Sequence, residues 1–337
     1  MLDLLLARAE QQWTNWFHHR PDGRLEPLLL AGGPAHRGRV SVLLFAEGRS
    51  PQAIMKIGFT RREGEFLETE FEAMSKLRPL LPPHLASSMP RALDLYQKDQ
   101  ITAVAAEVLE GERLLVPSLT GEVSTKARRI MDSYLRRSFA FARDLAEATA
   151  QPPSRNAEAL AGVVERFVAM FLEGEPATAR RVGSFGSAVA ESDIEWLPAW
   201  QHQDVAVGNV LEHRGQLRFV DWEHASPGCQ PWFDVAYAPI VTSHLAQRVD
   251  ALPSVREAAL AVLGATTPIG SVLRMRMEEV WDYPLPLGWG VALTAMIAAM
   301  RRVDEGRAGS AEWADLVKMM ICDEDFRAEL DWLVPRW

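Results

Sequence analysis

The stretch HQDVAVGNVL, residues 202–211, is followed closely by LRFVDWEHA, residues 217–225. Two acids and an amide, Asp204, Asn209 and Asp221, therefore occur close together in the chain. The apolar run 217–220 predicts a short strand that ends at Asp221, and Gly208 lets the backbone turn sharply beside Asn209. Carboxylate and amide oxygens are ligands that magnesium accepts together with phosphate oxygens and water. The pattern therefore predicts a magnesium site, with Asp204 free to accept a proton nearby.

The composition is that of an ordinary globular chain. Its 337 residues are 48% hydrophobic and 24% charged, which is enough for a large core and favours two lobes. The net charge of -9 argues against a nucleic-acid partner, which usually requires a basic stripe, and is compatible with a cationic or neutral substrate.

Neither the cysteines nor the hydropathy indicate export or membrane insertion. The only cysteines, Cys229 and Cys322, provide no disulfide framework and no zinc spacing, which predicts a reducing cytoplasm. The first 17 residues lack the features of a signal peptide, and the longest apolar candidate, Gly288–Met300, is too short to span a membrane.

Hydrophobic periodicity divides the chain into two parts. A helix over Leu2–Phe17 precedes strands at 25–30, 40–45 and 53–57, a helix at 62–80, and strands at 92–96 and 101–108. Helices are then expected at 124–149, 156–173, 254–263, 287–302, 311–321 and 324–333, while 174–187 is expected to be a mobile connection or a broken helix. The expected fold is α+β, with an antiparallel-sheet lobe over residues 1–107 and a larger helical lobe over 108–337.

Lys56 lies inside the apolar run AIMKIGF, where an unpaired ammonium would be costly to bury. A carboxylate partner is therefore expected, and Glu70 in ETEFEAMSKL is the candidate.

The spacing H-x-D-x-x-x-x-N, followed by an apolar strand and D-W-E, resembles the catalytic and metal loops of the aminoglycoside phosphotransferase and choline kinase-like family. AIMKIGF, ETEFEAMSKL, AAEVLEG (105–111) and SPGCQPWFDVA (226–236) extend the resemblance over residues 25–240. It implies a protein-kinase-like two-lobed fold and a kinase that moves the γ-phosphate of Mg-ATP to a hydroxyl of a small acceptor. One departure is Gln203, at a position where the family usually has glycine.

The resemblance also implies roles for individual residues. Lys56, held by Glu70, would contact the α- and β-phosphates of ATP. The backbone from Glu107 to Leu109 would hold the adenine. Gly32 and Gly33 would approach the phosphates. Asn209 and Asp221 would hold Mg2+, and Asp204 would take the proton of the acceptor hydroxyl. The expected supporting residues are His202 and Asp234.

Two other function classes stay open. A metal-dependent hydrolase would use His202, Asp204, Asp221 and His224 as ligands, but it leaves Lys56 and Glu70 unexplained. A non-catalytic pseudokinase would be expected to lack one member of the set, and none is missing. The chain has no G-x-x-x-x-G-K-[ST] motif of a P-loop kinase.

The sequence does not identify the acceptor, and aminoglycosides, other antibiotics, sugars, amino alcohols and thiamine-like alcohols all remain open. Glu223 is either a second metal ligand or an ordinary acid at a strand end. Trp281 and Trp289 either line an acceptor pocket or pack in the core. No nucleic-acid or membrane partner is expected, and the oligomeric state is open.

Overall fold

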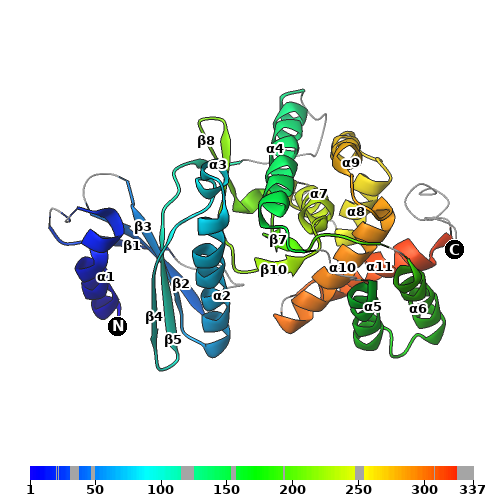
Figure 1. Ribbon diagram of the computed structural model, residues 1–337, viewed down its shortest axis with the longest axis horizontal. Coiled ribbons are helices and arrows are strands. Elements are labelled where there is room, and N and C mark those ends of the chain that lie inside the picture. Colours follow the sequence, from blue (N-terminus) through cyan, green and yellow to red (C-terminus); the bar gives the residue numbers. More distant parts are fainter. Residues whose placement is uncertain are drawn as a thin grey trace. The chain divides into compact units, whose positions relative to one another are not determined.

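A computed structural model describes residues 1–19, 21, 23–30, 38–46, 50–114, 125–152, 157–192, 194–246, 254–306 and 308–324. The chain divides into two compact units. Met1–Glu112 and Leu211–Ala225 form the sheet unit, and Arg113–Val210 with the chain from Ser226 onward form the helical unit. Strands dominate the first and helices the second, which confirms the predicted α+β fold (Figure 1). Residues 211–225 group with the sheet unit, whereas a single division after residue 107 assigns them to the second lobe.

The sheet unit is built on a five-stranded antiparallel sheet in the order β1-β2-β3-β5-β4. Helices α1 (Leu2–Phe17) and α2 (Arg61–Leu77) cover its two faces (Figure 1), and the short α3 (Pro83–Ala86) follows α2. The predicted helices and strands of this region are confirmed, with ends that differ by at most three residues. The strands are β1 (Glu26–Leu30), β2 (Arg39–Phe45), β3 (Ala53–Gly58), β4 (Ala92–Lys98) and β5 (Ile101–Glu107).

The alternation along β3 directs Lys56 to the face that α2 covers. Successive side chains of a strand point to opposite faces of the sheet. Met55 and Ile57 are buried in a core cluster with Trp13 and Trp16 of α1. Lys56 lies between them in sequence and therefore points to the other face.

A close approach of α2 to the sheet depends on Gly64. Helix α2 begins at an N-cap, Thr60, whose side chain accepts a hydrogen bond from the Glu63 backbone. A Cβ atom at Gly64 would lie 2.6 Å from the Thr102 hydroxyl of β5. The absence of a side chain at this position therefore allows the helix that carries Glu70 to lie against the strands.

A hairpin in the segment 211–225 leads to Asp221. Strand β8 (Val210–His213) pairs with β9 (Gln216–Phe219) and with the short β6 (Glu112–Arg113). Arg214 and Gly215 both have positive φ, 50° and 80°, as a two-residue type I′ turn requires. The Phe219 backbone N–H donates to Ser88 O at 2.7 Å, which attaches the hairpin to the rest of the sheet unit.

The helical unit also contains a small two-stranded sheet. Strand β7 (Ala199–Gln201) pairs antiparallel with β10 (Ser226–Cys229), so the loop after β7 begins at a fixed point. The helices are α4 (Thr125–Thr149), α5 (Ala157–Phe171), α6 (Pro176–Glu191), α7 (Phe233–Ala246), α8 (Val255–Leu263), α9 (Pro268–Val280), α10 (Leu287–Asp304) and α11 (Ser310–Cys322). The helix expected at 324–333 falls almost entirely outside the described residues.

Two helical predictions were wrong or incomplete. The segment 174–187, expected to be mobile or broken, lies mostly in the continuous helix α6. Pro176 occupies its first turn, where proline is well tolerated. A Cβ at Gly186 would lie 3.0 Å from Val164 of α5, so this glycine permits close helix packing. Helices α7 and α9 were not predicted, although Thr267, the N-cap of α9, followed by Pro268 is a start signal in the sequence.

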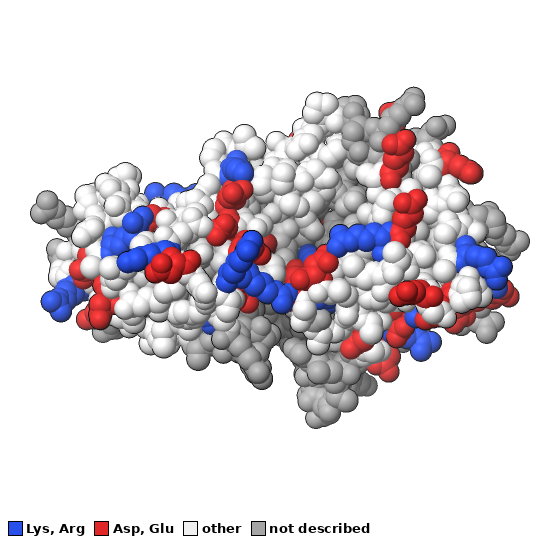
Figure 2. Space-filling model, turned by 90° about the horizontal axis from the view of Figure 1, so that it is seen from below, with Lys and Arg blue, Asp and Glu red and all other residues white. Residues whose placement is uncertain are grey.

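Charged side chains are mixed by sign on the surface drawn in Figure 2, where basic residues form no continuous stripe. None of the helices in the described part of the chain combines the length and apolarity that a membrane crossing demands.

Replacing Gly64 tests the approach of α2 to β5. Gly64→Ala is expected to lower the free energy of unfolding by about 1–3 kcal/mol, because the added methyl group meets Thr102. Gly162→Ala on α5 is the matched control, since a Cβ there meets nothing within 4 Å. The control is expected to raise the free energy of unfolding by about 0.5–1 kcal/mol. Urea denaturation measures both, and effects of the same sign would contradict the close approach.

Candidate active site

The predicted ion pair between Lys56 and Glu70 is confirmed in the sheet unit. Lys56 Nζ donates to both Glu70 carboxylate oxygens, at 2.6 and 2.8 Å. The same ammonium donates to Asp221 Oδ1 at 2.9 Å. The Glu70 residue is only 3% exposed. One ammonium is thus shared by two carboxylates that come from distant parts of the sequence.

The opposite charges of this cluster stabilise one another's ionised forms. Burial alone would lower the pKa of Lys56, but the carboxylates of Asp221 and Glu70 outweigh it and hold the pKa above its usual value. Burial would raise the pKa of Asp221, but the Lys56 ammonium and the Arg39 guanidinium hold it well below its usual range. Burial also raises the pKa of the Glu70 carboxyl, and the hydrogen bonds from Lys56 oppose that rise. Loss of one partner would leave a buried charge uncompensated.

The backbone turns abruptly at Asp221. Its φ is 68°, in the left-handed region that non-glycine residues seldom adopt. The next residue, Trp222, is fully buried, and its indole N–H donates to Phe219 O at 2.9 Å. The tryptophan therefore anchors the turn that presents Asp221, whose side chain is 30% exposed.

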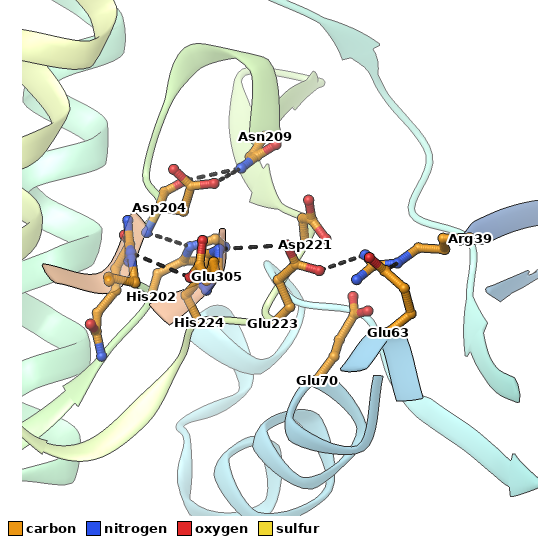
Figure 3. A network of polar contacts seen from close by, with 12 residues as sticks. Arg39, Glu63, Glu70, His202, Asp204, Asn209, Asp221, Glu223, His224 and Glu305 are labelled. Carbon is orange, nitrogen blue, oxygen red and sulfur yellow. Dashed lines mark hydrogen bonds and ion pairs between the residues drawn. The ribbon is translucent and has the colours of Figure 1, made fainter. Parts of the chain in front are cut away.

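A second buried ion cluster, which the sequence analysis missed, lies in the same unit. Arg39 donates to Glu223 Oε2 at 2.5 Å and to Glu63 Oε2 at 2.8 Å, and Figure 3 shows the three side chains. Burial would lower the pKa of Arg39, but the two carboxylates hold it above its usual value. Glu223 is 4% exposed and also lies 3.5 Å from His224, so its carboxylate already has partners. The only sequence signal was an arginine at the start of an apolar strand.

In the helical unit, the loop 202–209 holds Asp204 in place through its neighbours. The Asn209 amide nitrogen donates to Asp204 Oδ2 at 2.8 Å and to Asp204 O at 3.1 Å (Figure 3). The Asp204 backbone N–H donates to His202 Nδ1 at 3.3 Å. The His202 backbone N–H in turn donates to Asp234 Oδ2 at 2.9 Å. His202 and Asp234 are both buried, as expected of residues that support a loop.

Gln203 stands where the family usually has glycine, and its conformation shows why glycine suits the position. Its φ is 63°, which costs a non-glycine residue roughly 1–2 kcal/mol. The side chain donates to Ser226 Oγ at 2.7 Å and to Cys229 Sγ at 2.9 Å. Arg301 of α10 donates to the Gln203 carbonyl at 2.8 Å. These bonds offset the strain that a glycine would avoid.

Arg301 was also missed by the sequence analysis. Besides its bond to the loop, its guanidinium lies over the rings of Tyr237 and Phe233, 5.4 and 5.9 Å from their centroids. Its sequence position, in the pair RR at the end of a helix, was typical of an exposed helix terminus.

A pocket of about 210 Å³ opens beside Asp204, entirely within the helical unit. Charged and polar side chains form much of its wall, which the loop 204–209, α7 and the C-terminal end of α10 provide together. The lining residues are Asp204, Ala206, Gly208, Asn209, Tyr237, Val241, Arg301, Arg302 and Glu305. A carboxylate at the wall of a small polar pocket can bind a hydroxyl group and accept its proton.

The other predicted positions have mixed outcomes. Glu107 ends β5, where its backbone N–H donates to Arg91 O and that of Val108 donates to Gln52 O, which fixes the segment leading to Leu109. Gly32 and Gly33 lie outside the described residues. Gly208 lies in the short 3-10 turn Val207–Asn209, so the chain turns beside Asn209 as expected, but without a positive φ at the glycine.

Of the two tryptophans considered for an acceptor pocket, Trp289 is buried in the core and Trp281 is half-buried. Trp289 is 8% exposed and packs edge-on against Phe185. The Trp281 ring packs against Tyr283, and its indole N–H donates to Leu285 O at 2.9 Å. Neither residue lines the pocket beside Asp204.

The donor atoms suit a hard cation such as Mg2+. Because the Asn209 amide nitrogen is bound to Asp204, the amide oxygen is the atom left for a cation. One Asp221 oxygen is bound to Lys56, which leaves the other as a candidate ligand. Among the described residues, no three His, Cys, Asp or Glu side chains form a group that could hold a metal by themselves. A cation at either of these oxygen atoms would therefore need further ligands, such as the oxygens of a bound phosphate, as magnesium prefers.

The structure therefore brings the predicted residues together in two groups. Lys56, Glu70 and Asp221 meet in the sheet unit, and His202, Asp204, Asn209 and Asp234 meet in the helical unit. The convergence of both groups on one nucleotide stays a prediction.

Comparison with known proteins identifies similar sequences and folds. The model of the family described as "Phosphotransferase enzyme family" matches residues 37–268. The structure of aminoglycoside phosphotransferase APH(4)-Ia is similar with a TM-score of 0.57 and 12% identity, covering 97% of this chain and 99% of that one. The structure of a thermostable mutant of the same enzyme, in a ternary complex with AMP-PNP and hygromycin B, is similar with a TM-score of 0.56 and 12% identity, covering 97% of this chain and 99% of that one. The structure of a protein of Ralstonia eutropha JMP134, described as a candidate aminoglycoside phosphotransferase, has a TM-score of 0.55 and 16% identity, covering 98% of this chain and 97% of that one. No curated protein sequence matches the chain.

The pKa of Asp234 provides a test of the support beneath the loop. Burial raises this pKa to about 7, although the backbone N–H groups of His202 and Gln203 oppose the rise. The folded chain thus keeps a proton that the unfolded chain releases near pH ~3.9. The contribution of this proton to the free energy of unfolding is fully present below that pH and is lost as the pH rises to about 7.

Asp234→Asn keeps an acceptor oxygen but does not titrate. The melting temperature of the variant, relative to wild type, is therefore expected to rise as the pH increases from ~5 to ~7.5. Thermal unfolding across this range measures the difference, with the exposed Asp315→Asn as the control. A difference that is independent of pH would show that Asp234 is already ionised in the folded chain.

Proposed function

The chain belongs to the phosphotransferase enzyme family, and from this premise we propose that it is a small-molecule kinase. It would move the γ-phosphoryl group of Mg-ATP to a hydroxyl group of a small acceptor. The observation that carries the proposal is the sharing of the Lys56 ammonium by Glu70 and Asp221. A buried lysine held in this way is a fixed positive charge, suited to phosphate oxygens.

Each group of residues then has one task. In the sheet unit, Glu70 keeps Lys56 oriented toward the α- and β-phosphates, and the backbone from Glu107 to Leu109 holds the adenine. In the helical unit, Asn209 fixes the Asp204 carboxylate, which binds the acceptor hydroxyl in the pocket. As the acceptor oxygen bonds to the γ-phosphorus, the bond from that phosphorus to the β-phosphate oxygen breaks. The hydroxyl proton passes to Asp204, and the products are ADP and the phosphorylated acceptor.

Magnesium would be held by the Asn209 amide oxygen and the Asp221 carboxylate, and it would neutralise charge on the phosphate oxygens. The protein has little covalent chemistry to perform. Its contribution is to position both substrates and to keep charged groups fixed around the phosphates.

Nucleotide use is also supported by a protein of the same fold, since the APH(4)-Ia complex contains AMP-PNP. The hydrolase alternative has less support. His202 Nδ1, which would have to bind a metal, accepts a hydrogen bond from the Asp204 backbone. That alternative also assigns no purpose to the Lys56 cluster.

The variant Asp204→Asn tests the proposed base. It is expected to bind ATP normally but to lose turnover by on the order of 10²-fold or more, because asparagine cannot accept the hydroxyl proton. The assay is ADP formation across a panel of hydroxylated metabolites and antibiotics, together with calorimetric titration of Mg-ATP.

The control for this assay is Asp315→Asn on α11, whose side chain is 63% exposed, and it is expected to retain wild-type turnover. Full activity of Asp204→Asn would remove Asp204 from the base role. Absence of ATP turnover with every acceptor would contradict the kinase assignment itself.

A further inference from the structure

The wall of the pocket beside Asp204 carries two acids and two arginines. The acids are Asp204 and Glu305, and the arginines are Arg301 and Arg302. In the proposed reaction the Asp204 carboxylate is committed to the acceptor hydroxyl. What else the pocket can bind therefore depends on the remaining three charges.

Arg301 and Glu305 are engaged with the protein itself. Arg301 on α10 and Glu305, the C-cap residue of that helix, lie 3.8 Å apart, with side chains only 15% and 6% exposed. Arg301 also donates to the Gln203 carbonyl and, at 3.3 Å, to the Tyr237 hydroxyl. These contacts hold the loop 202–209 against α10, so Arg301 is a positioning residue.

Arg302 differs from its neighbour because no carboxylate of the described residues forms an ion pair with it. Its Nη1 donates to the Ala308 carbonyl at 3.1 Å, and its guanidinium lies beside the Tyr237 hydroxyl. Both partners are uncharged at neutral pH, so the Arg302 charge is not paired with a carboxylate in the part of the chain that the structure describes. A half-buried guanidinium in this situation favours binding of an anion.

The pocket also lacks what a polycation would need. A ligand with several ammonium groups requires several free carboxylates, but Glu305 is paired with Arg301 and Asp204 serves the hydroxyl. The volume of about 210 Å³ lies below the range of roughly 300–1,000 Å³ for drug-sized ligands. A small acceptor fits these dimensions better than a multi-ring aminoglycoside.

We propose that the acceptor is a small hydroxycarboxylate, whose carboxylate binds the Arg302 guanidinium while its hydroxyl group binds Asp204. This assignment rests on the proposed kinase function and names the substrate class of the same site. A planar guanidinium can hold a carboxylate through two parallel hydrogen bonds, which would also orient the hydroxyl group.

Matched acceptor triples test the assignment. Each triple keeps the hydroxyl group and varies only the other end as a carboxylate, an amide or an amine. Suitable sets are hydroxybutyrate, its amide and aminobutanol; glycerate, glyceramide and aminopropanediol; and hydroxymethylbenzoate, its amide and the matching amine. Phosphate transfer from labelled ATP is measured for each compound. In at least one set, the carboxylate is expected to exceed its amide and amine by about tenfold or more in kcat/KM.

The variant Arg302→Gln is expected to reduce the carboxylate-to-amide ratio of kcat/KM by about tenfold, whereas Arg302→Lys, which keeps the charge but loses the planar pair of donors, is expected to retain only part of it. Arg180→Gln on α6, which lies outside the pocket, is the matched control and is expected to leave the ratio unchanged. Thermal unfolding verifies that each variant is folded.

The results separate the substrate class from the kinase function. Preference for the amine or the amide, transfer to no carboxylate, or an unchanged ratio in Arg302→Gln would each overturn the hydroxycarboxylate assignment. Asp204-dependent transfer to a neutral or cationic acceptor would leave the kinase function standing. Absence of transfer to every compound, including the wider acceptor panel, would contradict both.

Discussion

The constraint on which the sheet unit depends is the burial of one ammonium group. Lys56 lies on a central strand, where an unpaired positive charge would be too costly to keep. It is stable there only because Glu70 and Asp221 approach within hydrogen-bonding distance. Helix α2 must therefore lie close to the sheet, and the hairpin β8–β9 must return to the same unit. The fold of this unit and its proposed phosphate site thus share one electrostatic requirement.

The loop 202–209 follows a related principle, since each of its functional side chains is held by a buried neighbour. The Asp234 carboxylate accepts a hydrogen bond from the His202 backbone N–H, and His202 Nδ1 accepts one from the Asp204 backbone N–H. The Asn209 amide nitrogen donates to the Asp204 carboxylate. Arg301 fixes the strained Gln203 from the other side. The proposed base is therefore preorganised before a substrate arrives, which is what positional catalysis of phosphoryl transfer demands.

The sequence predicted the features that local pattern determines. Short apolar runs predicted the strands of the sheet, and helical periodicity predicted the helices beside it. The isolated charge in AIMKIGF required a partner, which is Glu70. It did not predict Arg39 with Glu223 or Arg301 with Gln203, because those pairs are 184 and 98 residues apart and no local pattern joins them. The acceptor class that we propose could not be predicted from the sequence for the same reason. A net charge of -9 was compatible with a cationic or a neutral acceptor, whereas the pocket wall carries Arg302, with which no carboxylate of the described residues forms an ion pair.

The measurement that tests the central claim most directly is calorimetric titration of Mg-ATP into wild type, Asp221→Ala and, as a folded control in the same unit, Asp94→Ala. Asp94 pairs with Arg8, away from the Lys56 cluster. If Asp221 and Lys56 form the phosphate and magnesium site, the wild type and Asp94→Ala bind Mg-ATP equally, and Asp221→Ala loses magnesium-dependent binding. Unchanged affinity in a folded Asp221→Ala protein would contradict the account, because the shared ammonium would then have no role with the nucleotide.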